Sequence, residues 1–323
     1  MRKITSILII SLLSLFASSA AQSQCDLTKK LGVSRTIEID TTGGPIYGHY
    51  SFKKTLPLKK GEVVLTFDDG PHPEHTISVL KTLKDHCTKA TFFAVGSMAT
   101  LEPATLKAVA AAGHTIGAHS QTHPKMTLIP LANAKIEIEQ SFKEIIAAVG
   151  APIAPFFRYP GLRYSKTMNA YMTTRNIGVF SVDIVSGDTR NKNTPAILKQ
   201  TLGLLKRKGR GIILLHDLQE TTAAALPVLL DELKKGGYKI VHIVPKKKMG
   251  ETAYKKVMKE YVALLKNKSS KESSEVKVAG NSSTPEATSK KEQEIPEVTE
   301  IVTYDNKAVW KNISEALANF FDG

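Results

Sequence analysis

The stretch Val-Val-Leu-Thr-Phe-Asp-Asp-Gly-Pro at residues 63–71 combines a strand signal with two adjacent carboxylates. Its apolar residues predict a buried strand, and Gly-Pro predicts the turn that ends it. Asp68 and Asp69 repel each other at the rim of a core unless a metal ion or an arginine compensates their charge. A helix cap or an Asx turn explains one aspartate at such a turn, but not two. Because active sites of parallel α/β folds are built at the carboxyl ends of strands, both aspartates are candidate site residues.

Short apolar runs alternate with amphipathic runs from Glu62 to Val241. The apolar runs predict strands at 62–67, 90–95, 115–118, 155–158, 178–183, 211–215 and 238–241. The amphipathic runs predict helices at 76–86, 103–112, 132–149, 166–176, 194–208 and 222–235. This alternation predicts a parallel sheet covered by helices, either open or closed into a barrel, and residues 62–245 suffice for one domain with its own core.

A pair of histidines follows the third predicted strand. His119 and His123 lie four residues apart, and this spacing places both imidazoles on one side of a helical turn, within reach of one ion. Alone, such a pair is usually polar surface. Together with Asp69 it makes a set of two histidines and one carboxylate that leaves positions open for water, which is typical of catalytic rather than structural metal sites.

Three further predicted strands end in polar residues. Arg158 follows an apolar aromatic pair, Asp183 and Asp188 follow the strand at 178–183, and His216 follows the strand at 211–215. A lone histidine after a strand is more often a hydrogen-bonded rim residue than a catalyst. Polar groups at five strand ends of one fold indicate a shared site.

In chain order, the motifs Thr-Phe-Asp-Asp-Gly-Pro, His-Ser-x-x-His-Pro, Arg-x-Pro-Gly, Asp…Asp and Leu-Leu-His closely resemble the five motifs of the polysaccharide deacetylases, the NodB-homology carbohydrate esterases. The resemblance covers residues 62–245. It implies a distorted (β/α) barrel, usually of seven strands. It also implies a divalent metal, zinc or another transition metal such as cobalt, that serves to remove acetyl groups from N-acetylated sugars.

The resemblance gives each site residue a role. The implied metal ligands are Asp69, His119 and His123. Asp68 would be the base that takes a proton from the attacking water, with Arg158 holding it in place. His216 would be the acid that protonates the leaving amine, tuned by an aspartate of the fourth motif. We expect this aspartate to be Asp188, with Asp183 as the alternative.

Two positions depart from the family's motifs. The aspartates of the fourth motif are commonly three residues apart and followed by Trp, whereas here they are five apart and Thr189 follows. The third motif often has Tyr where this chain has Gly161, which keeps a backbone donor for the oxyanion but no aromatic wall. Both changes remove surface on which a sugar can stack. We therefore expect the substrate preference to differ more than the chemistry.

The ends of the 323-residue chain differ in composition from its centre. A basic start, a short apolar run and small residues predict a secretory signal peptide at 1–21, and with it an exported bacterial protein, periplasmic or secreted. Residues 22–61 predict an extension packed on the outside of the domain. The remainder predicts one more helix at 246–266, a disordered linker at 267–300 and an amphipathic C-terminal helix at 301–323.

The net charge of +14 lies mainly on residues 22–245, which carry about +10 once the signal and the nearly balanced tail are set aside. A basic body favours anionic surroundings, such as envelope polymers or a membrane surface, which the C-terminal helix could also contact. No aromatic-basic motif indicates nucleic acid, and no stretch beyond the signal is long enough to span a membrane. Cys25 and Cys87 either form one disulfide or remain two thiols.

The sequence therefore predicts a metal-dependent hydrolase that removes acetyl groups from an N-acetylated polysaccharide resembling peptidoglycan or chitin. An O-acetyl polysaccharide esterase is the alternative within the enzymes, because the same groups cleave esters. A non-catalytic glycan-binding module with the same fold would have no need of Asp68 beside Asp69. A metal-independent relative acting on small cyclic amides would not need the Asp-His-His set.

Overall fold

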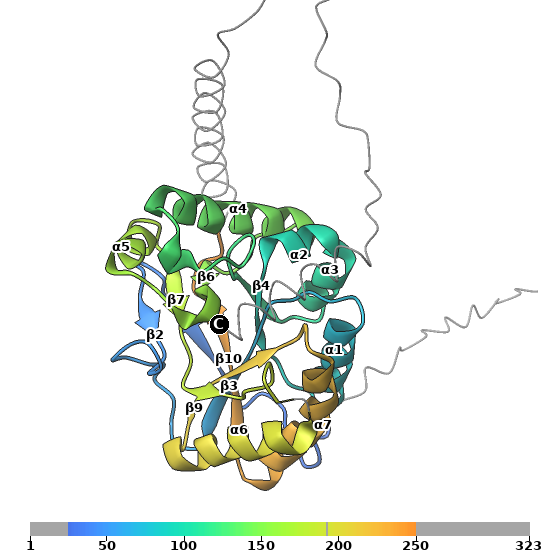
Figure 1. Cartoon of the computed structure of the whole chain (residues 1–323). Helices are drawn as coiled ribbons and strands as arrows, with labels where there is room; N and C mark the ends of the chain where they lie inside the picture. Colours follow the sequence, from blue (N-terminus) through green and yellow to red (C-terminus); the bar gives the residue numbers. More distant parts are fainter. Residues whose placement is uncertain (1–24, 192, 250–323) are drawn as a thin grey trace, which may run out of the picture.

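The computed structural model describes residues 25–191 and 193–249, which alternate strands and helices (Figure 1). Seven parallel strands are hydrogen-bonded side by side in the order β7-β6-β5-β4-β3-β9-β8. Their bounds are β3 Glu62–Asp68, β4 Thr91–Ala94, β5 Thr115–Ala118, β6 Phe156–Phe157, β7 Gly178–Phe180, β8 Ile184–Val185 and β9 Gly211–His216. The predicted parallel α/β architecture is confirmed.

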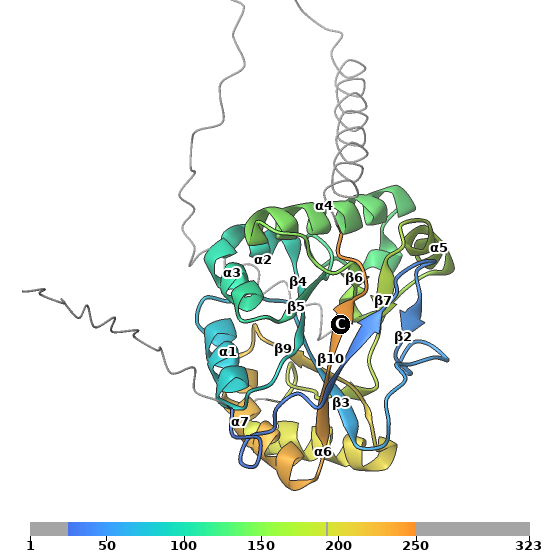
Figure 2. The same ribbon diagram turned by 180° about the vertical axis from the view of Figure 1, so that it is seen from behind.

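The row of seven strands is not closed into a continuous ring. Among the described residues no ladder joins β7 to β8, the two ends of the row. The N-terminal segment lies at this gap: β2 (Ile46–Tyr47) pairs with β7, and the backbone N–H of Tyr50 donates to the carbonyl of Val182 at 2.9 Å. This arrangement is consistent with a distorted barrel that is open between β7 and β8. Figure 2 shows β2 beside β7 at this end of the row.

The prediction that residues 22–61 pack on the outside of the domain is wrong. Two strands of this segment join the sheet, since β1 (Arg35–Ile39) pairs in parallel with β10 (Lys239–Pro245), and β2 pairs with β7. The Arg35 guanidinium also forms an ion pair with Glu62 at 2.7 Å. These strands are five and two residues long and carry no continuous apolar run, so hydrophobic patterning does not reveal them.

Six helices surround the strands and match the six predicted ones within two residues at each end. They are α1 His75–Asp85, α3 Pro103–Ala111, α4 Leu131–Val149, α5 Lys166–Thr174, α6 Thr194–Lys208 and α7 Glu220–Lys235. Their ends follow local chemistry: the Asn193 side chain caps α6 by accepting from the Ala196 N–H, and Gly150 ends α4 in the left-handed conformation. The short helix α2 (Gly96–Leu101) was not predicted.

The strands bury both faces, and the side-chain alternation separates two apolar cores. On β3, Val63, Leu65 and Phe67 belong to the core beneath the helices, whereas Val64 belongs to an inner core with Phe93 and Phe156. Thr66 and Asp68 share the inner face of β3 with Val64 because side chains alternate along a strand. The inner core therefore ends, at the carboxyl end of β3, in a carboxylate.

Cys25 and Cys87 form a disulfide that ties the first described residue to the end of the turn after α1. This resolves the alternative that the sequence left open. The segments 1–21, 267–300 and 301–323, for which the sequence makes predictions, lie outside the described residues, as does most of 246–266. In the described part of the chain, no helix is both long and apolar enough to cross a membrane.

Candidate active site

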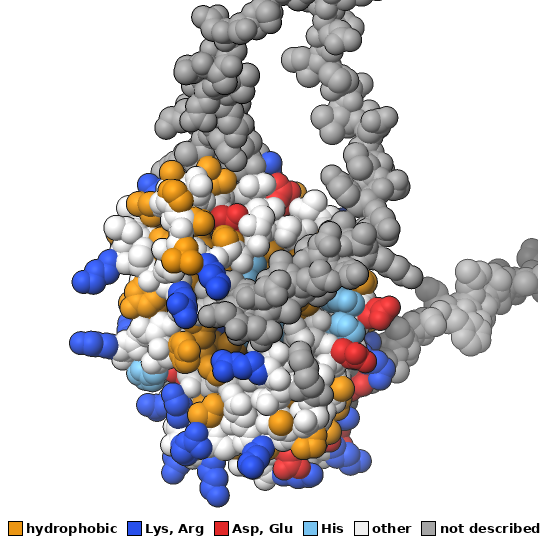
Figure 3. Space-filling view, in the orientation of Figure 1, with side chains coloured by type: hydrophobic (Ala, Val, Ile, Leu, Met, Phe, Trp, Pro, Cys, Tyr) orange, Lys and Arg blue, Asp and Glu red, His pale blue; other side chains and the backbone are white. Residues whose placement is uncertain are grey.

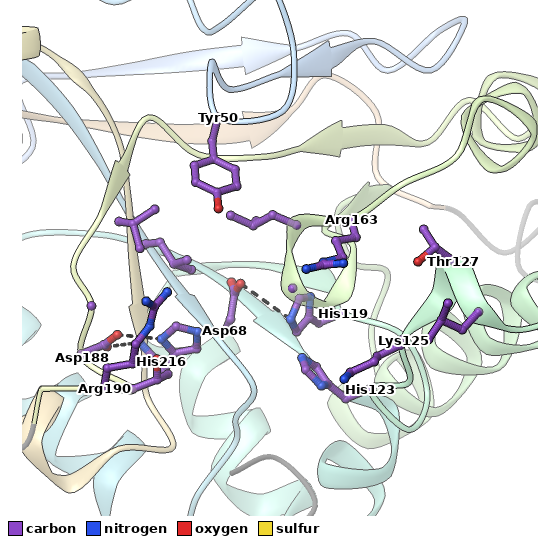
Figure 4. A pocket seen from close by; sticks show the side chains of 17 residues that line it. Tyr50, Asp68, His119, His123, Lys125, Thr127, Arg163, Asp188, Arg190 and His216 are labelled. Carbon is purple, nitrogen blue, oxygen red and sulfur yellow. Dashed lines mark hydrogen bonds and ion pairs between the residues drawn. The ribbon is translucent and has the colours of Figure 1, made fainter. Parts of the chain in front are cut away.

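Five predicted site residues meet at the carboxyl ends of neighbouring strands. Asp68 and His216 are the last residues of β3 and β9 and lie in register with each other. His119 and Arg158 each follow directly on a strand, β5 and β6, that pair side by side. Asp188 lies beyond β8, beside His216 (Figure 4). The parallel register of the sheet thus brings together side chains that are up to 148 positions apart in sequence.

The predicted metal ligands Asp69, His119 and His123 converge on one point. One ligand atom from each lies within 4.8 Å of the others, and both imidazole Nε2 atoms are 3.4 Å from Asp69 Oδ1. Asp69 is fully buried, yet neither of its carboxylate oxygens accepts a hydrogen bond from the described residues. A buried, unsatisfied carboxylate facing two imidazoles fits a divalent metal ion, so these three residues can hold one.

The ionisation of these ligands suits a cation. Burial disfavours a charged Asp69, but His123, His119 and His216 outweigh that cost and lower the pKa of its carboxyl group. Burial lowers the pKa of His123 to about 4, so that its imidazole is neutral at pH 7. The Nδ1–H of His119 donates to the carbonyl of Arg158 at 2.8 Å, and in this tautomer Nε2, which lies 3.4 Å from Asp69 Oδ1, is the nitrogen that can bind a metal ion.

The two histidines do not lie on a helical turn, and that part of the prediction is wrong. Residues 119–123 form a loop in which Ser120 and His123 have φ of 66° and 56°. Two hydrogen bonds support this conformation: the Ser120 hydroxyl accepts from the His123 N–H, and the Glu137 carboxylate accepts from the backbone of Gln121. Left-handed backbone at non-glycine residues is costly and is found where a site requires it.

Arg158 compensates the negative charge of Asp68, as expected. Its Nη1 lies 2.6 Å from Asp68 Oδ1, and both side chains are buried. The guanidinium also donates to Thr66 Oγ1 and to the carbonyl of Phe180, and it lies 4.2 Å from the ring centroid of Phe93. These contacts fix the guanidinium and hold Asp68 in one orientation beside the metal ligands.

Of the two aspartates of the fourth motif, Asp188 lies against His216. Asp188 Oδ1 is 2.8 Å from His216 Nδ1, and Oδ2 accepts from the His216 backbone N–H and the Thr222 hydroxyl. Burial opposes a charged His216, but Asp188, with Asp69 and Asp68 as smaller contributors, raises its pKa to about 10. Asp183 instead accepts from the backbone of His49 and the hydroxyl of Thr55, and so fastens the N-terminal segment.

The sequence analysis did not identify two residues that lie at or beside the site, Asp217 and Tyr50. Asp217 is buried, and its carboxylate accepts from the Gly70 N–H at 3.3 Å and from the Thr76 hydroxyl at 2.5 Å, so it supports the turn that carries Asp69. Burial raises the pKa of Asp217 to about 7. Asp217 directly follows His216 at the end of an apolar strand, and this position could have identified it from the sequence as a site residue. Tyr50 lies in the N-terminal segment, and nothing in the sequence near it pointed to the site.

A cleft of about 320 Å³ opens at the site, and Asp68, His119, His123, Asp188 and His216 are among the residues that line it. Tyr50, which is 61% exposed, stands at one wall (Figure 4), and the exposed Leu128 also lines the cleft. Gly161 also lines the cleft. The cleft combines a ligand set for one metal, a carboxylate held by an arginine and an imidazole held by a carboxylate. This combination can hold one divalent metal ion beside a candidate base and a candidate acid, at the carboxyl ends of parallel strands.

The chain belongs to the polysaccharide deacetylase family. Residues 55–179 match the family described as polysaccharide deacetylase. The chain is also 30% identical to a family 4 carbohydrate esterase from Streptomyces lividans, solved in complex with acetate, with a TM-score of 0.50. That match covers 59% of this chain and 94% of the esterase.

Two other relatives are named for peptidoglycan. A peptidoglycan deacetylase structure from Bdellovibrio bacteriovorus is 33% identical with a TM-score of 0.62, over 68% of this chain and 61% of that one. The peptidoglycan-N-acetylglucosamine deacetylase PgdA of Listeria monocytogenes is 32% identical over 181 residues, which are 56% of this chain and 38% of PgdA. The chain thus spans less than two thirds of the length of these two relatives.

Proposed function

We propose that this protein is a metal-dependent N-deacetylase that hydrolyses acetamido groups of a peptidoglycan- or chitin-like polysaccharide. The observation that carries the proposal is the buried Asp69-His119-His123 set beside two separately held groups, Asp68 and His216. Relatives named as peptidoglycan deacetylases support the choice of substrate class. Two imidazoles and one carboxylate favour zinc, with cobalt or another transition metal as substitutes.

The groups of the cleft suit amide hydrolysis. When bound, the divalent metal would lower the pKa of a water molecule and polarise the acetyl carbonyl. Asp68 lies 3.7 Å from His119 Nε2, close enough to the ligand set to take a proton from an attacking water, and Arg158 keeps that carboxylate oriented. The backbone N–H at Gly161 is the candidate donor to the developing oxyanion.

Departure of the amine requires a proton, and His216 is placed to supply it. Its Nδ1 is held by Asp188, which leaves Nε2 facing the ligand set, 3.9 Å from Asp69 Oδ2. A raised pKa keeps this imidazole protonated at neutral pH, so it can donate to the leaving nitrogen. Asp68 as base and His216 as acid thus lie near each other at the ends of the neighbouring strands β3 and β9 and line the same cleft (Figure 4).

Acetate release tests the proposal. The metal-loaded protein is incubated with N-acetylglucosamine oligomers, with peptidoglycan fragments and with an O-acetylated polysaccharide, and acetate is measured before and after treatment with a chelator. We expect acetate from the N-acetylated glycans, loss of that activity with chelator and recovery with zinc. Acetate from the O-acetylated polymer alone would indicate an esterase, and binding of a glycan without any acetate release would indicate a binding module.

We further propose that the protein is exported, with residues 1–21 as the signal peptide and 62–245 as the deacetylase domain. The basic body and the segment 301–323 are the candidates for contact with an anionic envelope or membrane surface. The disulfide between Cys25 and Cys87 supports export, because such bonds persist in oxidising compartments. Cell fractionation and N-terminal sequencing test this: an uncleaved cytoplasmic protein would contradict it.

A further inference from the structure

The loop that joins the two histidine ligands, residues 119–123, is held by the first residues of α2. The backbone N–H of Gly96 donates to the carbonyl of Ser120 at 3.0 Å. The backbone N–H of Ser97 donates to the carbonyl of Gln121 at 2.9 Å. The approach is close, because a Cβ atom at Gly96 would overlap the side chain of Gln121. The carbonyl groups of this loop are therefore fixed by the backbone of a neighbouring helix.

The N–H groups of the same loop are held by one carboxylate of α4. Glu137 Oε2 accepts from the backbone N–H of Gln121 at 2.9 Å and from that of Thr122 at 2.8 Å. Glu137 Oε1 accepts from the Thr122 hydroxyl at 2.8 Å. Hydrogen bonds to an ionised acceptor are stronger than those between neutral groups. A single half-buried side chain thus fixes two consecutive peptide groups between the two imidazoles.

The two histidine ligands depend on this loop to different degrees. His119 continues directly from β5, its backbone N–H donates to the carbonyl of Ala94 at 2.8 Å, and its Nδ1–H donates to the carbonyl of Arg158. His123 lies at the far end of the loop, where its backbone N–H donates to the Ser120 hydroxyl. The φ values of 66° at Ser120 and 56° at His123 are costly for residues other than glycine, so the surrounding contacts must impose them. Loss of these contacts should displace His123 more than His119.

We propose that Glu137 is a positioning residue for the metal site. By holding the loop in its left-handed path, it keeps His123 Nε2 beside Asp69, 3.4 Å from Oδ1. A ligand that is already in place binds a metal ion more tightly, because binding then does not have to order the loop. Glu137 does not line the cleft and lies outside the five sequence motifs, so it acts only through the loop. This inference rests on the proposed metal-dependent function and adds to it a residue that sets the affinity for the metal.

The zinc affinity of the full chain, measured by competition with a chelator, tests this role in the wild type, in Glu137→Gln and in Glu137→Ala. Glutamine keeps one acceptor oxygen but turns an amide donor toward the loop, whereas alanine removes all three hydrogen bonds. We expect the Kd for zinc to rise about threefold to tenfold in Glu137→Gln and about 10-fold to 100-fold in Glu137→Ala. The visible absorption of the cobalt-substituted protein reports the coordination of the ion and should change in the same order. At saturating zinc, kcat on N-acetylglucosamine oligomers should recover most of its wild-type value.

Glu139→Gln is the matched control, because Glu139 lies on the same helix but accepts from Tyr171 and Arg175 at the end of α5. The control separates positioning from charge. The domain is basic, with lysine and arginine outnumbering acidic side chains on the face shown in Figure 3, so loss of any carboxylate weakens the attraction of a cation.

Glu139→Gln removes the same charge and should keep the zinc Kd of the wild type. Equal zinc Kd values in the wild type and in both Glu137 variants, or an equal rise in Glu139→Gln, would overturn the inference. Glu137→Gln, the milder change, decides the question if the alanine variant does not fold. If zinc binds but no acetate is released by the wild type, the N-deacetylase proposal fails, and the zinc Kd values alone decide the role of Glu137.

Discussion

Replacing Asp188 by asparagine removes the charge that faces His216 and leaves the shape of the side chain nearly unchanged. In the structure this carboxylate is fully buried and accepts from His216 Nδ1 and from the His216 backbone N–H, both at 2.8 Å. An asparagine can keep one of these bonds as an acceptor but cannot stabilise the imidazolium. We therefore expect Asp188→Asn to remain folded and to lose the acid of the reaction.

The size of the loss follows from the ionisation of His216. A pKa of about 10 instead of the ordinary 6.5 corresponds to about 5 kcal/mol of preference for the protonated imidazole. Asp188, Asp69 and Asp68 together stabilise the protonated imidazole, and a cation bound at the metal site would reduce the contributions of Asp69 and Asp68. Assigning about 2–3 kcal/mol to Asp188 predicts a fall in kcat of roughly 100-fold, within the range expected for loss of a general acid.

Two substrates separate this role from a structural one. The N-acetyl group of a chitooligosaccharide leaves as an amine and needs a proton, whereas p-nitrophenyl acetate releases a phenolate that does not. Asp188→Asn should lose roughly 100-fold in kcat on the amide, little on the activated ester, and none of its bound metal. An equal loss on both substrates, or no loss on the amide, would refute the assignment of Asp188.

Asp183→Asn is the matched control, because the sequence could not distinguish the two aspartates. Asp183 accepts from the backbone of His49 and Ile212 and from the Thr55 hydroxyl, and it contacts none of the reacting groups. Its replacement should lower the free energy of unfolding by about 1–3 kcal/mol, as expected for a weakened buried hydrogen-bond network. At temperatures where the variant is folded, its kcat should match that of the wild type.

The remaining predictions concern the substrate platform, the support of the metal ligands and the response to pH. Tyr50→Ala should raise KM about threefold to tenfold with kcat unchanged, because an exposed aromatic wall is lost, and Tyr50→Phe should restore most of the affinity; an equal defect in both would argue against stacking. Asp217→Ala should weaken metal binding by about tenfold in a competition titration with a chelator, because the turn carrying Asp69 loses its support, and the exposed Asp231→Ala should have no effect. Burial lowers the pKa of His114 to about 3. Below pH 6.5 this histidine therefore binds a proton in the unfolded protein but not in the folded one, and the free energy of unfolding decreases as the pH is lowered. Urea unfolding at pH 7 and at pH 5 measures this effect. The decrease in the free energy of unfolding between the two pH values should be about 2 kcal/mol smaller in His114→Gln than in the wild type, and equal decreases would contradict the prediction.

The sequence predicted the strands that carry buried apolar runs and all six long helices, because hydrophobic period and capping residues are local signals. It could not predict β1 and β2. Both strands are short, and their places in the sheet depend on pairing with β10 and β7, which are distant in sequence. The same limit explains Tyr50, whose place at the cleft depends on where β2 docks.

Much of the site was also predictable, since Asp68, Asp69 and His216 follow directly on apolar strands. The path of the loop at residues 119–123 was not, because left-handed backbone at Ser120 and His123 is fixed by contacts with other parts of the loop and with α4. The choice between Asp188 and Asp183 also needed the structure. Both follow the same predicted strand, and only the pairing of β8 with β9 places Asp188 beside His216.

We propose that the two adjacent aspartates have separate roles, with Asp69 holding the metal and Asp68 transferring the proton. The most direct test measures bound metal and acetate release on the same preparation of Asp68→Asn, with Asp69→Asn alongside. We expect Asp68→Asn to bind about one metal ion per chain, as the wild type does, and to release acetate at least 100-fold more slowly. Asp69→Asn should lose the metal itself. Full turnover by metal-loaded Asp68→Asn would contradict the account.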